Sequence, residues 1–331
     1  GRTDVTGATL DFNSIGNVGG GASALGAPTT VADGTIRLGV QDGAIGVPGT
    51  LRYTGTDPAG HSTDRVIELP TGGGGVIESN GAGPLKFTAP SFTISPGGKS
   101  LTLGGTNTDE NEVESNIPDA SGVNDDLTVL KTGPGVWILS GGNNYRGPTR
   151  LDEGTLSVSA DNNLGNASST VEFGGGTLRI TGDSFNSTAR SFDLSSGDAQ
   201  FDIVDLSNSF SLNSVLSGAG GFRKRGAGRL ELAAANSYAG TTIISGGRLI
   251  ANAASLPAAG GVVNHSEFEL NQIVDGTFSG AISGVGNLHK SGAARLILSG
   301  SSSYTGDTII EAGRFSLCAS NILTNSTDVV L

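Results

Sequence analysis

The stretch KRGAGRLELAAANSYAGTTIISGGRLI at residues 224–250 decides the fold, because its spacing recurs twice elsewhere in the chain. A second copy starts earlier, at Lys131, and a third starts later, at Lys290. The spacing is fixed inside a copy, whereas the intervals between copies differ, which predicts a repeat protein in which whole coils separate the marked ones. The matching residues are Lys224, Gly226, Gly228, Leu232, Asn236, Tyr238, Gly240, Thr242, Gly247 and Leu249; Lys131, Gly133, Gly135, Leu139, Asn143, Tyr145, Gly147, Thr149, Gly154 and Leu156; and Lys290, Gly292, Ala294, Leu298, Ser302, Tyr304, Gly306, Thr308, Gly313 and Phe315.

Each copy contains a short strand with alternating apolar residues, as in Leu230-Glu231-Leu232, which is typical of a strand with one buried face. The Asn-x-Tyr-x-Gly-x-Thr element that follows predicts a turn, since asparagine and glycine tolerate the left-handed backbone region. One coil cannot bury its apolar side alone, so neighbouring coils must stack. No segment shows the sustained apolar stripe of an amphipathic helix. The sequence therefore predicts an all-β parallel β-solenoid with almost no helix.

Composition excludes several other classes of protein. The chain has 55 glycines, no methionine, 5% aromatic residues and 15% charged residues, which favours tight turns over a core of large side chains. The net charge is −12, so we expect no nucleic-acid partner, because phosphate backbones repel an acidic chain. The single cysteine, Cys318, excludes an internal disulfide framework. No apolar run reaches the roughly 20 residues of a membrane-spanning helix, so we expect no membrane span within this segment.

The repeated pattern resembles the autotransporter-associated β-strand repeat, also called the passenger-associated transport repeat. It matches best at 131–156 and 224–249, and less well at 290–315, where Ala294, Ser302 and Phe315 depart from the usual glycine, asparagine and leucine. The resemblance implies a right-handed parallel β-helix in a bacterial autotransporter passenger. It also implies an extracellular location at the bacterial cell surface, or secretion.

We expect residues 1–331 to form a single continuous solenoid segment of a longer protein or fibre. The repeat pattern is cut at both ends, and neither end shows a polar cap. We therefore expect the ends to stack either on more of the same chain or, by end-to-end self-association, on identical copies. Residues 109–126 break the pattern with seven carboxylates and no basic residue. Because like charges in adjacent strands repel, we expect this stretch to leave the solenoid as an acidic loop.

The sequence contains no convincing catalytic, cofactor-binding or metal-binding set. His61, His265 and His289 lie in unrelated contexts, and His289 is expected at the surface. Cys318 has no histidine nearby in the sequence, so we expect a small inward or edge residue and not a nucleophile. Trp137 fits either the core or the surface.

Charged residues near the repeats are expected to face solvent. We predict that Lys131, Lys224 and Lys290 point outward, and that the basic run Arg223-Lys224-Arg225 with Arg229 forms a solvated face. The rings of Tyr145, Tyr238 and Tyr304 are expected to cover coil edges with their hydroxyls in water. With this placement, the recurring lysines, glycines and tyrosines of the three copies line up as columns.

Carboxylates offer the main alternatives. Asp125-Asp126 and the cluster at 109–114 resemble the acid pairs with which some β-helix proteins cleave polysaccharides, or ligands for calcium. We favour a solvated acidic loop over both. Three functions remain: a non-enzymatic structural or adhesive surface stalk or fibre segment, which we prefer; a polysaccharide-binding or -degrading β-helix; and a cation-dependent assembly module. Host-surface or glycan ligands are compatible with the first.

Overall fold

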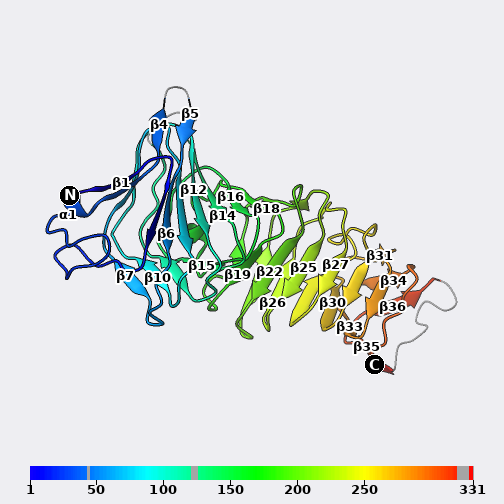
Figure 1. Cartoon of the computed structure of the whole chain (residues 1–331). Helices are drawn as coiled ribbons and strands as arrows, with labels where there is room; N and C mark the ends of the chain where they lie inside the picture. The colour runs from blue at the N-terminus through cyan, green and yellow to red at the C-terminus, as the bar shows by residue number, and fades with distance from the viewer. Residues whose placement is uncertain (43–44, 121–125, 319–327, 331) are drawn as a thin grey trace. The chain divides into compact units, whose positions relative to one another are not determined.

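The computed structural model describes residues 1–42, 45–120, 126–318 and 328–330. Within these ranges the only helical turns are α1 (Val31–Gly34) and the 3-10 turn η1 (Asp161–Leu164), and the rest of the regular structure is β. The chain forms two compact units, Gly1–Val171 and Glu172–Leu331. In both units the strands pair in parallel, and each strand lies beside the strand one coil later (Figure 1). The predicted parallel β-solenoid is confirmed.

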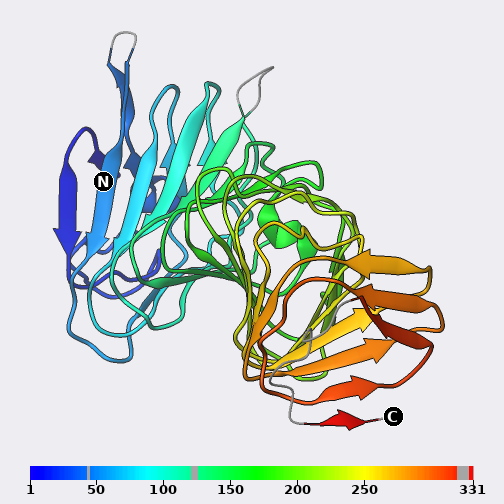
Figure 2. The same cartoon turned by 90° about the vertical axis from the view of Figure 1, so that its right-hand side faces the viewer.

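Unit 1 contains three parallel sheets, each named here after one of its strands. Figure 2 shows strands of this unit side by side, coloured in chain order from blue through cyan towards green. A separate antiparallel hairpin joins β4 (Val40–Asp42) and β5 (Ile45–Val47). The β3 sheet contains β1 (Thr3–Val5), β3 (Ile36–Leu38), β8 (Ile67–Leu69) and β11 (Thr93–Ile94); the β14 sheet contains β2 (Thr9–Phe12), β6 (Gly49–Tyr53), β9 (Gly75–Ser79), β12 (Lys99–Gly104), β14 (Leu127–Lys131) and β16 (Thr149–Leu151); the β15 sheet contains β7 (His61–Thr63), β10 (Leu85–Phe87), β13 (Asn111–Val113), β15 (Val136–Leu139) and β17 (Thr155–Val158).

Unit 2 is built in the same way. Strand β18 (Val171–Phe173) contains the position in the sequence at which unit 1 ends and unit 2 begins. Strand β21 (Phe192–Asp193) pairs with β24 (Leu216–Ser217). The β27 sheet contains β19 (Thr177–Ile180), β22 (Ala199–Ile203), β25 (Phe222–Arg225), β27 (Thr242–Ile244), β29 (Val262–Asn264) and β32 (Ile282–Gly284); the β28 sheet contains β20 (Ser187–Thr188), β23 (Ser209–Leu212), β26 (Arg229–Leu232), β28 (Arg248–Ala251), β30 (Glu267–Asn271), β33 (Asn287–Ser291), β35 (Thr308–Ile310) and β37 (Val329–Val330); the β34 sheet contains β31 (Gly276–Phe278), β34 (Arg295–Leu298) and β36 (Arg314–Leu317).

Inward side chains form the core of each unit. In β6 and β22 every second residue is buried, as the two-residue period of a strand requires. In unit 2 the inward rings contact one another from coil to coil: Phe201 lies 5.3 Å from Phe173 and 5.5 Å from Phe222, measured between ring centroids. Phe222 lies 5.9 Å from Tyr238. The few aromatic residues of the chain are thus concentrated where they stack.

The acidic stretch 109–126 does not leave the solenoid as a single loop, so that prediction is wrong for its first part. Asn111–Val113 form β13, which pairs with β10 on one side and β15 on the other. Like-charge repulsion between strands does not arise, because the outward Glu112 lies opposite Lys86 of β10, with 2.8 Å between the ammonium nitrogen and a carboxylate oxygen. Residues 121–125 lie outside the described residues.

Candidate functional site

Each repeat folds as two stacked coils. In copy two, β25 and β26 make the first coil, and β27 and β28 stack on them in the second. Phe222 lies opposite Thr242, and Leu230 lies opposite Leu249. Copy one uses β14, β15, β16 and β17 with the same offsets, and copy three uses β33, β34, β35 and β36. The repeat is therefore a two-coil unit whose partner strands lie inside the same sequence motif.

The lysine that begins each copy holds the two coils together. Lys224 is fully buried, and its Nζ donates hydrogen bonds to the carbonyl oxygens of Arg225 (2.5 Å) and Gly226 (3.0 Å) in its own turn. A third bond, of 3.1 Å, reaches the carbonyl of Gly246 in the turn of the next coil. The ammonium therefore gives part-buried carbonyls of both coils a shared donor.

The same three bonds recur in the other copies. Lys131 donates to the carbonyls of Thr132 (2.8 Å), Gly133 (2.6 Å) and Glu153 (3.1 Å). Lys290 likewise donates to the carbonyls at the two positions that follow it and at the equivalent position of the next coil. The prediction that the three lysines point outward is wrong, because all three are at most 1% exposed. Each lies two positions after an inward apolar residue, such as Phe222, so strand alternation places it inward.

Burial changes the acid–base behaviour of these lysines. It lowers the pKa of Lys131 and of Lys224 to about 8, and it lowers the pKa of Lys290 as well. Desolvation disfavours the ammonium, whereas the three carbonyl acceptors favour it. At neutral pH the side chains of Lys131 and Lys224 remain largely protonated. Lys131 and Lys224 are therefore buried charges held by backbone dipoles.

The tyrosine of each copy closes the side of the coil that has no strand. In copy two the chain runs from β26 to β27 through a loop, and the ring of Tyr238 is buried beneath it. The Tyr238 hydroxyl lies 2.6 Å from Oγ1 of Thr242, and burial raises the pKa of Tyr238 to about 12. The expectation of wet hydroxyls is wrong, since Tyr145 and Tyr304 are buried and make the same contact with the threonine of their own copy.

The asparagine of each of the first two copies bridges neighbouring coils. The Asn236 Oδ1 accepts a 2.8 Å hydrogen bond from the Leu216 N–H in the preceding coil. Its Nδ2 donates to the Ser255 carbonyl, 2.7 Å away, in the following coil. Asn143 makes the equivalent bonds to the coils before and after it, and copy three has the buried Ser302 in this position.

The copies do not line up in one column, contrary to the expectation from the sequence. Lys224 belongs to β25 in the β27 sheet, whereas Lys290 belongs to β33 in the β28 sheet. The column of Lys224 continues, one coil at a time, through Ile244, Asn264 and Gly284. Gly284 ends β32 of the β27 sheet, and Lys290 follows it a few positions later in β33 of the β28 sheet. The third copy therefore begins on the next sheet of the coil.

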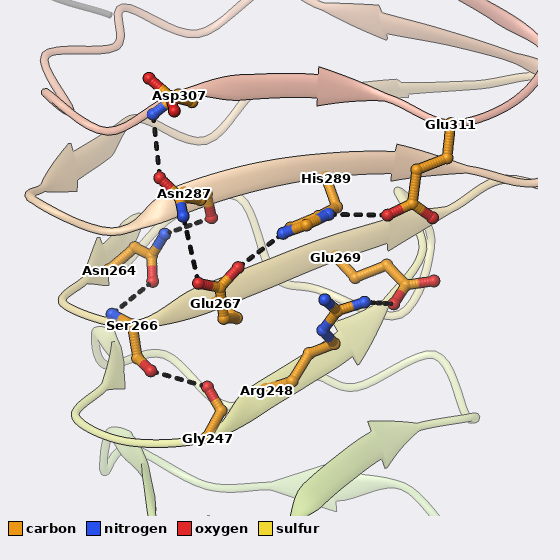
Figure 3. A network of polar contacts seen from close by, with 10 residues as sticks. All are labelled: Gly247, Arg248, Asn264, Ser266, Glu267, Glu269, Asn287, His289, Asp307 and Glu311. Atoms are coloured by element: carbon orange, nitrogen blue, oxygen red, sulfur yellow. Dashed lines mark hydrogen bonds and ion pairs between the residues drawn. The ribbon is translucent and has the colours of Figure 1, made fainter. Parts of the chain in front are cut away.

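His289 lies in a network on the outer side of the β28 sheet (Figure 3). Its Nδ1 is 2.8 Å from Oε1 of Glu311, and its Nε2 is 2.5 Å from Oε2 of Glu267. The residue faces outward, as its position in the strand predicts, but it is only 7% exposed, because the two carboxylate side chains cover it. The expected surface placement is therefore wrong. The ring bridges three successive coils.

Several of the acidic residues considered as calcium ligands or catalytic acids have basic or backbone partners. Arg146 Nε lies 2.5 Å from Asp119 and 3.3 Å from Asp126. Asp109 accepts the Gly83 N–H at 2.9 Å. Asp125, the other member of the predicted acid pair, lies outside the described residues. Among the residues that the structure describes, no cluster of three or more His, Cys, Asp or Glu side chains is arranged to hold a metal ion.

The remaining candidates separate in space. The basic run splits, since Lys224 is buried while Arg225 and Arg229 are exposed. Cys318 is exposed, and Trp137 is fully buried with its Nε1 donating to the Gly104 carbonyl at 2.9 Å. Across the described part of the chain, no helix is long and apolar enough to cross a membrane. The geometry thus provides structural polar contacts inside the solenoid.

Comparison with known proteins supports the repeat assignment. The family model for the passenger-associated-transport-repeat matches residues 129–158, 222–251 and 288–317. Over 165 residues the chain is 33% identical to the adhesin BmaC autotransporter of Brucella suis biovar 1 (strain 1330). That alignment covers 49% of this chain and 4% of the Brucella protein. No solved structure matches the chain.

Proposed function

Because the chain is a β-solenoid with three passenger-associated transport repeats, similar over about half its length to an autotransporter adhesin, we propose that it is a non-enzymatic stalk segment of an adhesive bacterial surface protein. It acts outside the cell, at the cell surface or after secretion. The observation that carries the proposal is the construction of each repeat, in which two coils are fastened by a buried lysine and closed by a buried tyrosine.

Such a unit suits a protein that must hold its shape without a globular core. Stability in a solenoid comes from contacts between neighbouring coils, and the lysine and asparagine contacts both connect adjacent coils. Outward charges reinforce the stacking. Arg52 of β6 pairs with Glu78 of β9 at 2.6 Å, and Arg179 of β19 pairs with Asp202 of β22 at 3.0 Å. These contacts support a structural role.

The proposal is tested by displaying residues 1–331 on a non-adherent laboratory bacterium, between an export signal and an outer-membrane anchor. We expect a protease-resistant segment that makes the cells adhere to host cells or matrix-coated surfaces. Beads coupled through the exposed Cys318, the single cysteine of the chain, test the same property with one orientation. Heat-denatured chain on the beads is the matched control.

Two results would contradict the proposal. One is a displayed segment that protease degrades rapidly, since a stalk must stay folded outside the cell. The other is cleavage of acidic or neutral polysaccharides by the purified chain, which would favour the degradative β-helix alternative. End-to-end association belongs to the same proposal, and electron microscopy of the purified chain tests it, since discrete short particles count against a fibre.

A further inference from the structure

Two arginine pairs in unit 2 depart from the charge pattern of other strand ladders. In ladders of both units, outward charges that lie opposite each other have opposite signs at several positions. Arg229 of β26 instead lies opposite Arg248 of β28. Arg295 of β34 likewise lies opposite Arg314 of β36. Because like charges directly opposite each other in a sheet repel, each pair favours an anion that bonds to both guanidinium groups.

The two pairs occupy the same positions of copies two and three, but their surroundings differ. In copy three, Arg295 Nε donates to Ser316 Oγ at 3.0 Å on the β34 sheet. In copy two the pair lines a hollow of about 360 Å³ where strands of the β28 sheet begin, called here the arginine hollow. The residues that line it are Leu206, Ala227, Arg229, Gly247, Arg248 and Glu267. Arginine charge and a concave surface therefore coincide in copy two.

Arg229 supplies a positive charge that the fold does not neutralise. It is exposed, and among the described residues its guanidinium makes no ion pair or hydrogen bond. Arg248 pairs with Glu269 through Nη1 at 3.0 Å, which leaves its other N–H groups available. A guanidinium fork matches the two oxygens of a carboxylate, so this pair of arginines suits a carboxylate or another oxyanion.

The other walls of the arginine hollow distinguish between anions. Leu206 is 77% exposed beside the arginines, and an exposed aliphatic side chain at a hollow suits a ligand with an apolar surface. Glu267 adds a carboxylate that accepts from Asn287 and contacts His289. Each carboxylate oxygen has two acceptor positions, so Glu267 can still accept a hydroxyl hydrogen. A bare sulfate or phosphate gains nothing from the leucine and is repelled by the glutamate.

We propose that the arginine hollow binds a uronic acid unit of an acidic polysaccharide. The carboxylate of the sugar lies between the guanidinium groups of Arg229 and Arg248. One of its hydroxyl groups donates to Glu267, and the C–H face of its ring packs on Leu206. The inference names a ligand class for the proposed adhesive function, and it rests on that function for its biological role.

An acidic peptide fits the arginine hollow less well. An extended peptide gains affinity from backbone hydrogen bonds to its receptor. The Gly247 carbonyl, a backbone acceptor at the hollow, already accepts from the Glu267 N–H at 3.2 Å and from Ser266 Oγ at 2.8 Å (Figure 3). A sugar does not need this acceptor, because its carboxylate and hydroxyl groups bond to side chains.

Saturation-transfer NMR of the purified chain tests the proposal, with methyl glucuronide as the probe and methyl glucoside as the uncharged comparison. We expect millimolar binding of the glucuronide, because the hollow lies at the lower end of the roughly 300–1,000 Å³ of ligand pockets. The glucoside lacks the carboxylate and should bind about 10-fold more weakly.

Two variants test the walls of the hollow. Arg229→Gln should weaken glucuronide binding about 10-fold or more, and Leu206→Ser about 3-fold or more. Arg295→Gln is the matched control, because Arg295 is also an exposed arginine opposite another arginine but does not line the hollow. It should leave binding unchanged. Thermal melting confirms that each variant folds.

Four outcomes overturn the proposal: no saturation transfer to the glucuronide, a glucoside that binds equally well, acetate or sulfate that binds as tightly as the glucuronide, or a control that weakens binding as much as Arg229→Gln. An acidic peptide that binds more tightly than the glucuronide would also overturn it. The display assay has its own readout. Cells that adhere although the glucuronide does not bind refute this inference alone, and glucuronide binding without adhesion refutes the proposed function alone.

Discussion

Replacing Lys224 by methionine tests the central contact of the repeat. Methionine keeps most of the apolar stem and removes the ammonium, so the carbonyls of Arg225, Gly226 and Gly246 lose a shared donor. Each carbonyl left without a donor costs about 1–3 kcal/mol, and relief of the ammonium's burial, which lowers the pKa of Lys224 to about 8, offsets about half of that loss. We expect a net loss of about 3 kcal/mol at neutral pH.

Urea unfolding and hydrogen exchange measure the effect. The free energy of unfolding should fall by the stated amount, and the amides of β25 to β28 should lose protection first, because the lysine joins these two coils. Lys86→Met is the matched control. Lys86 is a half-exposed lysine that pairs with Glu112 on the outer face, and its loss should cost no more than about 1 kcal/mol. If Lys224→Met unfolds at the same urea concentration as the wild type, or loses protection evenly along the chain, the lysine does not fasten the coils.

Three other perturbations follow from the same geometry. Raising the pH from 8 to 10.5 should stabilise the wild type relative to Lys224→Met by up to about 3 kcal/mol. In this range Lys224, whose pKa is lowered to about 8 in the folded chain, has lost a proton that the unfolded chain still binds. If the difference in unfolding free energy between the two proteins shrinks as the pH rises, the carbonyls outweigh burial. Gly247→Ala should cost more than about 2 kcal/mol in urea unfolding, because its φ is +61° and a Cβ would lie 2.2 Å from the Gly228 carbonyl oxygen, whereas Gly182→Ala, at φ +72° with open space around it, should cost about 1 kcal/mol. Calcium at millimolar concentration should leave the melting temperature unchanged, since Arg146 already neutralises Asp119 and Asp126, and a clear rise would restore the cation-dependent alternative.

The architecture could be predicted from the sequence because the repeat fixes both strand period and coil stacking. The alternating leucines of Leu230-Glu231-Leu232 identify a strand, and the fixed spacing to Leu249 identifies its neighbour one coil later. The shift of the third copy to another sheet also follows from the spacing. The interval from Lys224 to Lys290 is not a whole number of coils, so the third copy begins on another sheet. The length of a coil comes only from the strand register, which the sequence does not show.

The predicted placement of the lysines and tyrosines is wrong because residue type and strand parity point in opposite directions at these positions. A lysine in an unknown strand is normally solvated, whereas Lys131 shares its parity with the buried Val129. Backbone carbonyls hold it inward, and because every residue has one, the sequence does not indicate where such a set of acceptors forms. The cover over His289 was hidden for a related reason, since Glu267 and Glu311 belong to the coils before and after it and are distant in the sequence.

The regular pitch between β25, β27, β29 and β32 has an evolutionary consequence. Unequal recombination between similar gene segments can add or remove the residues of one whole coil. Such a change leaves every later side chain on the same face of its sheet, inward or outward, as before. An insertion that is one residue longer or shorter than a coil, and that falls within a strand, turns the inward side chains of that strand outward and exposes residues that were buried. Genes of this kind can therefore change the length of their product in steps of one turn, with selection acting mainly at the junctions.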